Sequence, residues 1–190
     1  YGGYMPYSRV FDLLWNGKRH ALVGPVQIDR WGQANIACIG DFAKPKRQML
    51  GMRGFPGNSI NHGNSFFVPN HGTRVFVEDQ VDVVCSVGYR DESWEAGVKR
   101  DYASIKHIVT NLCVMDFGGP DHAIRVISLH PGVSFEEVQQ NTGFPLIQAE
   151  DCGETAHPTA EQLEIIRKLD PRDVRSKQIK DNPPGIRQAA

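Results

Sequence analysis

The sequence predicts an α/β fold in which a largely parallel sheet is covered by helices. Several runs rich in valine and isoleucine show little period-two alternation, which is typical of strands buried on both faces. Two further segments carry the sequence pattern of helix N-terminal caps. With 190 residues, 40% hydrophobic and 23% charged, and no visible repeat or linker, the chain is predicted to form one globular domain spanning 1–190.

The first predicted element is a short helix from Ser8 to Trp15, where apolar residues recur at helical spacing. Gly17 follows at the position of a C-cap. The predicted strands are the apolar runs at 21–28, 74–77, 81–87, 105–115 and 123–129.

Two later helices are predicted from capping boxes, in which two side chains satisfy free backbone N–H groups reciprocally. Ser134 with Glu137 starts the first helix, which is expected to end at Gly143. Thr159 with Gln162 starts the second, which is expected to end near 170–171. The stretch 89–101 is charged and has little hydrophobic periodicity, so it is predicted to be an exposed surface segment.

Both ends of the chain carry loop-like sequence. The chain starts at Tyr1 rather than methionine, so we expect an N-terminally truncated domain with further sequence upstream. The segment 181–190, which contains Pro183 and Pro184, is predicted to be a flexible tail or to lie along a partner.

Composition limits the classes of partner. The formal charge of −1 provides no overall basic field for nucleic acid or an anionic membrane. No apolar run reaches the roughly 18 residues of a membrane span, and the start lacks a signal-peptide pattern. We therefore predict a cytoplasmic protein with neither nucleic-acid nor membrane partners. The four cysteines are dispersed, and buried free thiols are favoured over disulfides.

The segment 51–71 contains many residues that could bind an anion or a carbonyl oxygen. Glycines at 51, 54 and 57 allow a close backbone approach to an anion or a carbonyl oxygen, and several asparagine and histidine side chains follow as donors. The segment is neither a Walker loop nor a dinucleotide fingerprint. An oxyanion-binding loop and an ordinary surface loop are both compatible with this pattern.

The histidines of this segment do not predict a metal site. His62 and His71 lack the further ligands at zinc-binding spacing, so no metal or cofactor is expected. Hydrogen bonding to a substrate carbonyl or to a loop backbone is favoured instead. No Gly-x-Ser-x-Gly elbow supports a serine triad.

Three motifs carry a resemblance to a known family. Gln27-Ile-Asp-Arg-Trp-Gly-Gln-Ala-Asn35 resembles the signature of type I CoA-transferase beta subunits, with Trp31 and Gln33 in place of the usual tyrosine and asparagine. The stretches 109–117 and 130–138 resemble a strand and a strand-to-helix joint of that superfamily. The order of the motifs agrees from about 5 to 171.

Within this superfamily the chain is most similar to a narrower group. The segments 5–11, 54–62, 70–71, 74–78 and 117–122 resemble the beta subunit of the cholesterol ring-degrading CoA hydrolases of actinobacteria. The resemblance implies a three-layer α/β sandwich of the CoA-transferase type, related to ribose-phosphate isomerase and glucosamine-phosphate deaminase. It also implies hydrolysis of a carbon–carbon bond in a cyclic keto-acyl-CoA, which opens the last steroid-derived ring in cholesterol catabolism.

The resemblance implies a partner chain as well. Such a beta subunit is expected to act only with an alpha subunit, as αβ or (αβ)₂, and coenzyme A enters as part of the acyl-CoA substrate. Truncation would expose a sheet edge or an apolar face that the partner or the upstream segment covers.

Two alternatives to the hydrolase stay open. A CoA-transferase would move CoA between carboxylic acids through a glutamyl-CoA thioester, using a Glu-x-Gly segment upstream of the signature, which this chain does not contain. A non-catalytic scaffold subunit is the other alternative. In the ring hydrolases the essential glutamate is expected on the alpha subunit. We therefore assign no catalytic residue to this chain, and the essential glutamate is placed on the alpha subunit or upstream.

The candidate substrate-binding residues combine residue chemistry with the resemblance. Arg53 suits a substrate carboxylate, Asn58 and His62 suit a polarised carbonyl, and Gly54 and Gly57 suit close backbone approach. Gln27 is added from the signature. Two neighbours of Gln27 in the signature, Asp29 and Asn35, are predicted to fix a turn through Asx-type backbone bonds.

Overall fold

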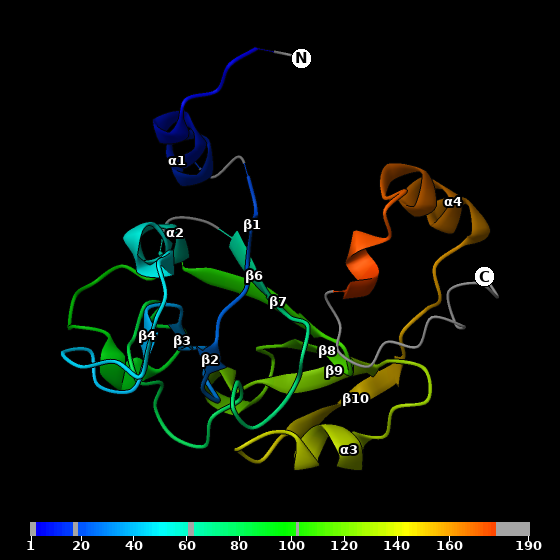
Figure 1. The fold of residues 1–190 in the computed structure, drawn as a ribbon. Coiled ribbons are helices and arrows are strands. Elements are labelled where there is room, and N and C mark those ends of the chain that lie inside the picture. Colours follow the sequence, from blue (N-terminus) through cyan, green and yellow to red (C-terminus); the bar gives the residue numbers. More distant parts are fainter. Residues whose placement is uncertain (1–2, 17–18, 61–62, 102, 178–190) are drawn as a thin grey trace.

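The centre of the molecule is a six-stranded mixed sheet with the order β1-β6-β7-β8-β9-β10 (Figure 1). This computed structural model describes residues 3–16, 19–60, 63–101 and 103–177. The strands are β1 (Ala21–Val23), β6 (Gly63–Val68), β7 (Ser104–Thr110), β8 (Cys113–Asp116), β9 (Arg125–Leu129) and β10 (Ile147–Glu154). Pairing is parallel except on both sides of β8, which runs antiparallel to β7 and β9. The predicted α/β fold with a largely parallel sheet is confirmed.

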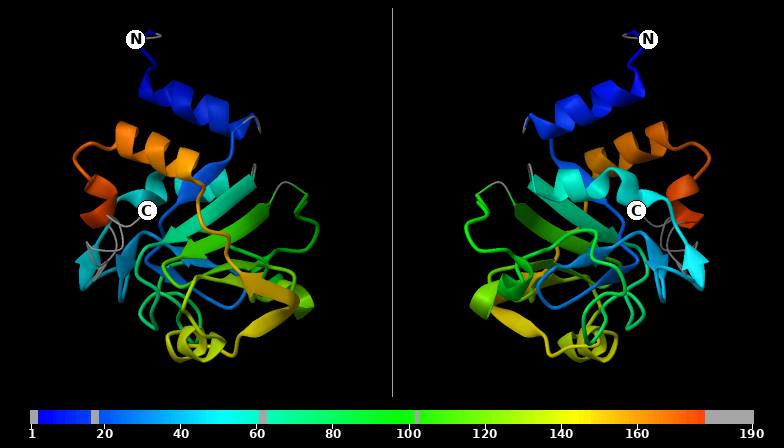
Figure 2. Two further views of the ribbon diagram at one scale, coloured as in Figure 1. Left: turned by 90° about the vertical axis from the view of Figure 1, so that its right-hand side faces the viewer. Right: turned by 90° about the vertical axis from the view of Figure 1, so that its left-hand side faces the viewer.

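The remaining elements lie on the two sides of this sheet. Helices α1 (Tyr7–Trp15), α2 (Phe55–Ser59) and α4 (Ala160–Leu169) lie above it, and α3 (Phe135–Gln140) lies below (Figures 1 and 2). Two short ribbons, β2 (Gln27–Ile28) with β3 (Ala34–Asn35) and β4 (Cys38–Ile39) with β5 (Arg47–Gln48), complete the fold. Short 3₁₀ turns occur at Gly51–Arg53, Asp91–Ser93, Pro120–His122 and Val174–Lys177. The three-layer arrangement agrees with the predicted sandwich.

Several predicted strands are wrong in extent. The run 105–115 is a hairpin of β7 and β8, because the Thr110 hydroxyl oxygen accepts bonds of 3.0 Å from the amides of Leu112 and Cys113 and reverses the chain. The runs 74–77 and 81–87 form only isolated bridges, Ile28 with Phe76 and Ala34 with Ser86. The run 21–28 divides into β1 and β2, and β10 was not predicted because its sequence is largely polar.

The helix predictions are largely confirmed. The expected helix at 8–15 is α1, and α4 has a complete capping box in which Thr159 and Gln162 bond each other's backbone amides. Before α3 only the Ser134 half of the box forms, and the helix ends at Gln140, ahead of the expected Gly143. Gly143 instead donates its amide to the Phe76 carbonyl at 2.8 Å.

The remaining predictions concern the chain ends, the 89–101 stretch, the cysteines and membrane spans, and some of them fall on residues that the structure does not describe. Gly17, the expected C-cap of the first helix, and the tail 181–190 lie outside the described residues. The 89–101 stretch is mostly exposed, as predicted. All four cysteines are free thiols, which confirms the preference over disulfides, although Cys152 is only partly buried. Within the described ranges, no helix is both long and apolar enough to cross a membrane.

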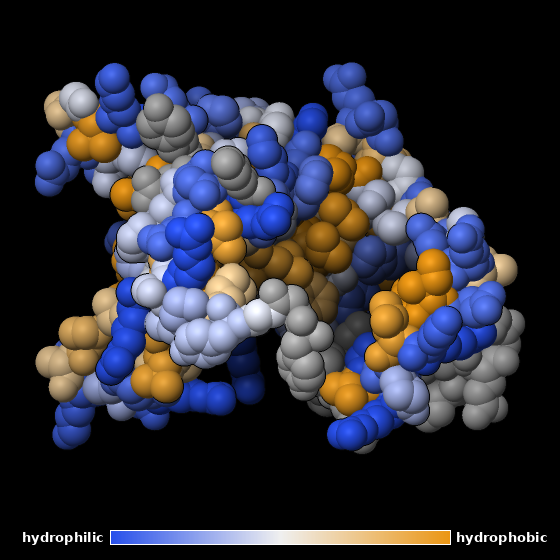
Figure 3. All heavy atoms as spheres, turned by 90° about the horizontal axis from the view of Figure 1, so that it is seen from above, coloured by the Kyte–Doolittle hydropathy of each residue, from blue (hydrophilic) through white to orange (hydrophobic). Residues whose placement is uncertain are grey.

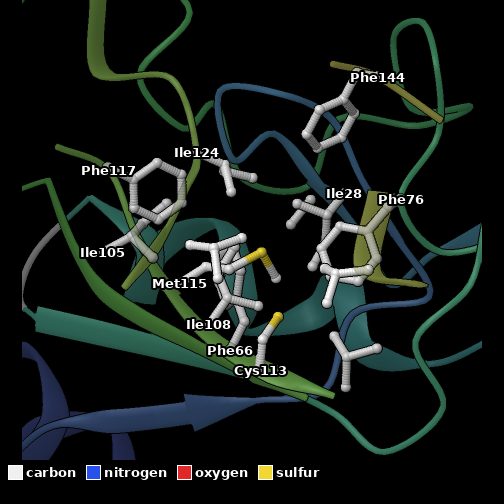
Figure 4. Close-up of a cluster of buried hydrophobic side chains, with 14 of the residues drawn as sticks. Ile28, Phe66, Phe76, Ile105, Ile108, Cys113, Met115, Phe117, Ile124 and Phe144 are labelled. Carbon is white, nitrogen blue, oxygen red and sulfur yellow. The ribbon is translucent and has the colours of Figure 1, made fainter. Parts of the chain in front are cut away.

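The hydrophobic core lies against one face of the sheet (Figure 4). Directly paired residues on neighbouring strands share a face. The register pairs Phe66 with Ile108, Ile108 with Met115 and Met115 with Val126, and all four are fully buried. Ile28 and Phe76, from the chain that crosses below the sheet, complete this cluster.

The opposite face of the sheet is apolar but incompletely covered. Phe67, Val109 and Val114 are paired across β6, β7 and β8, and Phe67 is 37% exposed. Leu22 on β1 is 68% exposed, and α4 contains no buried residue. Seen from the side that carries α1 and α4, the surface of the molecule has a hollow with a hydrophobic floor (Figure 3). We call Leu22, Phe67, Val109 and Val114 the outer sheet face.

Candidate functional site

A pocket of about 740 Å³ lies between α1, the chain that follows β1, and the segment 49–58. Its walls are mainly apolar, with side chains such as Phe11, Leu22 and Val26. Three predicted binding residues, Arg53, Gly54 and Asn58, line it together. We call it the Arg53 pocket.

Besides the exposed Tyr7, the pocket has two polar side chains, Arg53 and Asn58, which differ in their hydrogen bonding. Arg53 is exposed and makes no ion pair within the described ranges. Asn58 accepts a hydrogen bond of 2.8 Å at Oδ1 from the indole Nε1 of Trp15. Because an indole N–H only donates, this bond fixes the orientation of the amide and leaves the Asn58 NH₂ as a donor. In addition to the Tyr7 hydroxyl, the pocket therefore offers one cation and one oriented amide donor.

The glycines of the segment have a packing role that the sequence did not predict. A Cβ at Gly54 would lie 2.6 Å from the Phe11 ring, and one at Gly51 would lie 2.4 Å from the Ile36 side chain. A Cβ at Gly57 would lie 3.3 Å from the ring of Trp15. These positions therefore allow α1 and Ile36 to pack closely, which is a structural reason for glycine independent of a bound anion.

Gln27 does not join these residues. It is buried, and its Oε1 accepts hydrogen bonds from Asn35 Nδ2 at 2.7 Å and from the Asp82 amide at 3.0 Å. It lines a neighbouring pocket of about 480 Å³ instead. His62, the other predicted site residue, lies outside the described residues.

The turn after Gln27 is held by the predicted Asx-type bonds. Asp29 Oδ1 accepts from the amides of Trp31 at 3.0 Å and Gln33 at 2.8 Å. Asn35 Oδ1 accepts from the Ala37 amide at 2.9 Å. Burial raises the pKa of Asp29, against the opposing effect of these amides and of Arg90, whose guanidinium lies 3.5 Å away. The structural interpretation of these two signature residues is confirmed.

His71 belongs to the interior rather than to a pocket. Its Nε2 lies 3.0 Å from Thr142 Oγ1 and its Nδ1 lies 3.1 Å from Thr110 Oγ1, while the ring stacks on Phe76. The Thr142 hydroxyl donates to the Val138 carbonyl at 2.8 Å and the Thr110 hydroxyl donates to the Cys113 carbonyl at 3.2 Å, so the single N–H of the neutral ring has a threonine oxygen as acceptor on either side. Burial lowers the pKa of His71 to about 4, which keeps the ring neutral.

A further pocket, of about 770 Å³, was missed from the sequence. Its lining includes Trp94, Arg100 and the rings of Tyr89 and His122, which stack at 5.0 Å. His122 and its neighbour Asp121 have positive φ angles of 58° and 52°, which are strained for residues with a Cβ. The signal was present in the motif 117–122, which carried only a family resemblance. Within the described ranges, no group of three histidine, cysteine or carboxylate side chains is placed to hold a metal ion.

Known proteins give three informative likenesses, although no protein-family profile matches the chain. The cholesterol ring-cleaving hydrolase IpdB subunit of Rhodococcus jostii RHA1 is 46% identical over 178 residues, which cover 93% of this chain and 70% of that protein. The crystal structure of Rhodococcus jostii RHA1 IpdAB superimposes with a TM-score of 0.86 and 44% identity over 94% of this chain and 71% of that chain. A 3-oxoadipate CoA-transferase subunit from Pseudomonas knackmussii is 33% identical over 88% of this chain and 65% of that protein.

These likenesses confirm the resemblance carried by the signature motifs. The identity extends over nearly the whole chain, and it is higher to the ring-cleaving hydrolase subunit than to the CoA-transferase subunit. The chain therefore belongs to the family of the cholesterol ring-cleaving hydrolase IpdB subunits.

Proposed function

We propose that this chain is the beta subunit of a heteromeric hydrolase that opens the last steroid-derived ring of a cyclic keto-acyl-CoA in cholesterol catabolism. The observation that carries the proposal is the 46% identity to the Rhodococcus jostii IpdB subunit across 93% of the chain. A CoA-transferase activity is the second candidate, supported by the 33% identity to the 3-oxoadipate CoA-transferase subunit.

The Arg53 pocket is proposed as this subunit's part of the acyl site. Its apolar walls suit a hydrocarbon ring, the Arg53 guanidinium suits a substrate carboxylate, and the Asn58 NH₂ suits a carbonyl oxygen that gains negative charge. Gly54 and Gly57 shape this loop against α1. His62, which follows in the same segment of the sequence, is kept as a proposed donor to the carbonyl.

The acid–base group is proposed to come from an alpha subunit. Among the described residues that line the Arg53 pocket, none is a carboxylate or a histidine, and Tyr7 is 76% exposed at its rim. Hydrolysis beside a ketone requires proton transfer, which side chains of those types supply. This absence from the described lining supports a glutamate contributed by the partner, in an αβ or (αβ)₂ assembly.

The outer sheet face supports the same partnership. A soluble monomer rarely leaves contiguous apolar surface exposed, and here Leu22 of this face also lines the Arg53 pocket. A partner seated over this face would therefore close the pocket. We further propose a single domain and a cytoplasmic location, the latter supported by four free thiols.

The test is reconstitution of the chain with its alpha subunit and analysis of products by mass spectrometry. Ring hydrolysis adds one water to the acyl-CoA, and in ¹⁸O-water the label enters a new carboxylate while the thioester stays intact. Transfer of CoA to an added free carboxylic acid would instead support the transferase. If the alpha subunit alone turned over the substrate at a rate that this chain did not change, this chain would have only a scaffold role.

A further inference from the structure

The pocket that Gln27 lines adjoins the Arg53 pocket. Val26 and Met49 line both, so the two hollows share a wall. The second hollow is otherwise aliphatic, apart from the Gln27 amide and two arginines, Arg47 and Arg74. We call it the Arg47–Arg74 groove.

The groove carries positive charge that the fold does not neutralise. Arg47 and Arg74 are exposed, and neither makes an ion pair with a carboxylate within the described ranges. Arg47 ends the run Lys44-Pro-Lys-Arg47, which places three cations within four residues. The Asp82 amide bonds Gln27, and the Asp82 carboxylate accepts the Gly40 amide but forms no ion pair with Arg47 or Arg74.

The two arginines come from distant segments that the backbone holds together. Arg47 pairs with Ile39 in the β4–β5 ribbon, and the Lys46 amide donates to the Ile39 carbonyl at 2.9 Å. The segment of Arg74 is tied to β2, because Ile28 bonds the backbone of both Val75 and Val77. Their common position is therefore set by the fold rather than by flexible loops.

Gln27 adds an oriented donor to the same groove. Both partners of its Oε1 are N–H donors, which fixes the amide and leaves only the NH₂ group to bond a ligand. Two guanidiniums and an amide NH₂ around an aliphatic floor suit a ligand with several phosphate oxygens at one end of an apolar chain.

We propose that the Arg47–Arg74 groove binds the phosphorylated nucleotide end of the acyl-CoA, while the acyl group occupies the Arg53 pocket. The pantetheine arm then passes over Val26 and Met49. This assignment rests on the proposed CoA-ester substrate. It explains how a chain of formal charge −1 attracts a polyanion, since the necessary cations are gathered locally.

The experiment compares two substrates in the reconstituted complex. The same acyl group is presented as its CoA ester and as its pantetheine ester, which lacks every phosphate. Arg47→Ala and Arg74→Ala are each expected to raise KM for the CoA ester about tenfold or more, because a charge-assisted phosphate bond contributes about 1.5–3 kcal/mol. The kcat, and both constants for the pantetheine ester, should stay within about twofold of wild type. Arg172→Ala, an exposed arginine that lines none of these hollows, is the matched control.

Binding of adenosine 3′,5′-bisphosphate, followed by calorimetry, separates this proposal from the proposed reaction. Binding that weakens in Arg47→Ala and Arg74→Ala and with added salt supports the groove, even if the wild-type complex fails to turn over the CoA ester. Equal effects on CoA and pantetheine esters, or no effect on either, would overturn the assignment. Loss of the alpha subunit in the variants, with no nucleotide binding by the wild-type complex, would identify an acidic protein surface as the occupant instead.

Discussion

Trp15 and Asn58 are joined by a hydrogen bond of 2.8 Å between the indole Nε1 and the amide Oδ1. The bond links α1 to α2 and determines which end of the Asn58 amide can act as a donor. It makes Trp15 a positioning residue for the Arg53 pocket.

Replacing Trp15 should therefore affect the pocket through Asn58. Trp15→Phe keeps an aromatic ring but removes the donor, so the amide loses its fixed orientation and kcat should fall about two- to tenfold. In an Asn58→Ala background the same substitution should add no further loss of kcat. Additive losses in this double-mutant cycle would mean that Trp15 acts by another route.

Direct substitutions of the pocket should be more severe. Asn58→Ala removes a donor aimed at the developing oxyanion and should lower kcat about 10²-fold or more in the reconstituted complex. Arg53→Ala should raise KM for the carboxylate-bearing substrate, because the ion pair is lost. Changes within about threefold for both variants, with the complex intact by light scattering, would remove the Arg53 pocket from the acyl site.

Asp29 should matter to stability rather than to substrate binding. Asp29→Asn keeps an oxygen for the two amide donors but loses the attraction of Arg90, and Asp29→Ala removes the acceptor as well. We expect the Ala variant to lose about 1–3 kcal/mol and to melt below wild type, whereas the Asn variant should melt close to wild type, because burial opposes the charge that it removes. KM should change little. A large loss of turnover at unchanged Tm would contradict the structural role.

His71 should make the fold acid-sensitive. Its pKa is about 4 in the folded chain, against the ordinary histidine value of 6.5 that applies once the chain unfolds. Between these pH values the unfolded chain binds more protons, so stability falls as pH is lowered. The full effect amounts to about 3 kcal/mol at the low end of this window. Thermal unfolding from pH 7.5 to 4.5 measures it.

The matched variant separates His71 from the other six histidines. His71→Asn should lower Tm at neutral pH, because the bonds to two threonine hydroxyls are disturbed, yet flatten the pH dependence. An equally steep pH dependence in this variant would assign the acid sensitivity to other groups.

The outer sheet face should be required for assembly. Phe67→Glu removes the burial of the remaining exposed third of the ring, about 0.5–1 kcal/mol, and places an unpaired charge against the alpha subunit, which costs more, so recovery of the co-expressed complex should fall about tenfold or more. Val98→Glu alters another exposed apolar side chain outside this face and should leave assembly unchanged. Equal recovery of both variants in size-exclusion chromatography would place the partner elsewhere.

Features that depend on neighbours along the chain could be predicted from the sequence. The capping box of Thr159 and Gln162 and the turn at Asp29 involve residues only two to four positions apart, so their side-chain chemistry specifies the local geometry. The signature around Gln27 likewise identified the family. The end of α3 was misjudged because Gly143 bonds to Phe76, which lies far away in the sequence.

What the sequence by itself determined is the α/β class, the main helices, the free thiols and the family. The tertiary structure decided that 105–115 turns back on itself, that Arg53 and Asn58 share a pocket which Gln27 does not line, and that Arg47 and Arg74 line a second pocket. The physical reason is that local motifs are stabilised by bonds between near neighbours, whereas pockets are defined where distant segments pack together. The position of a charged side chain in such a pocket depends on backbone pairings that no single stretch of sequence contains.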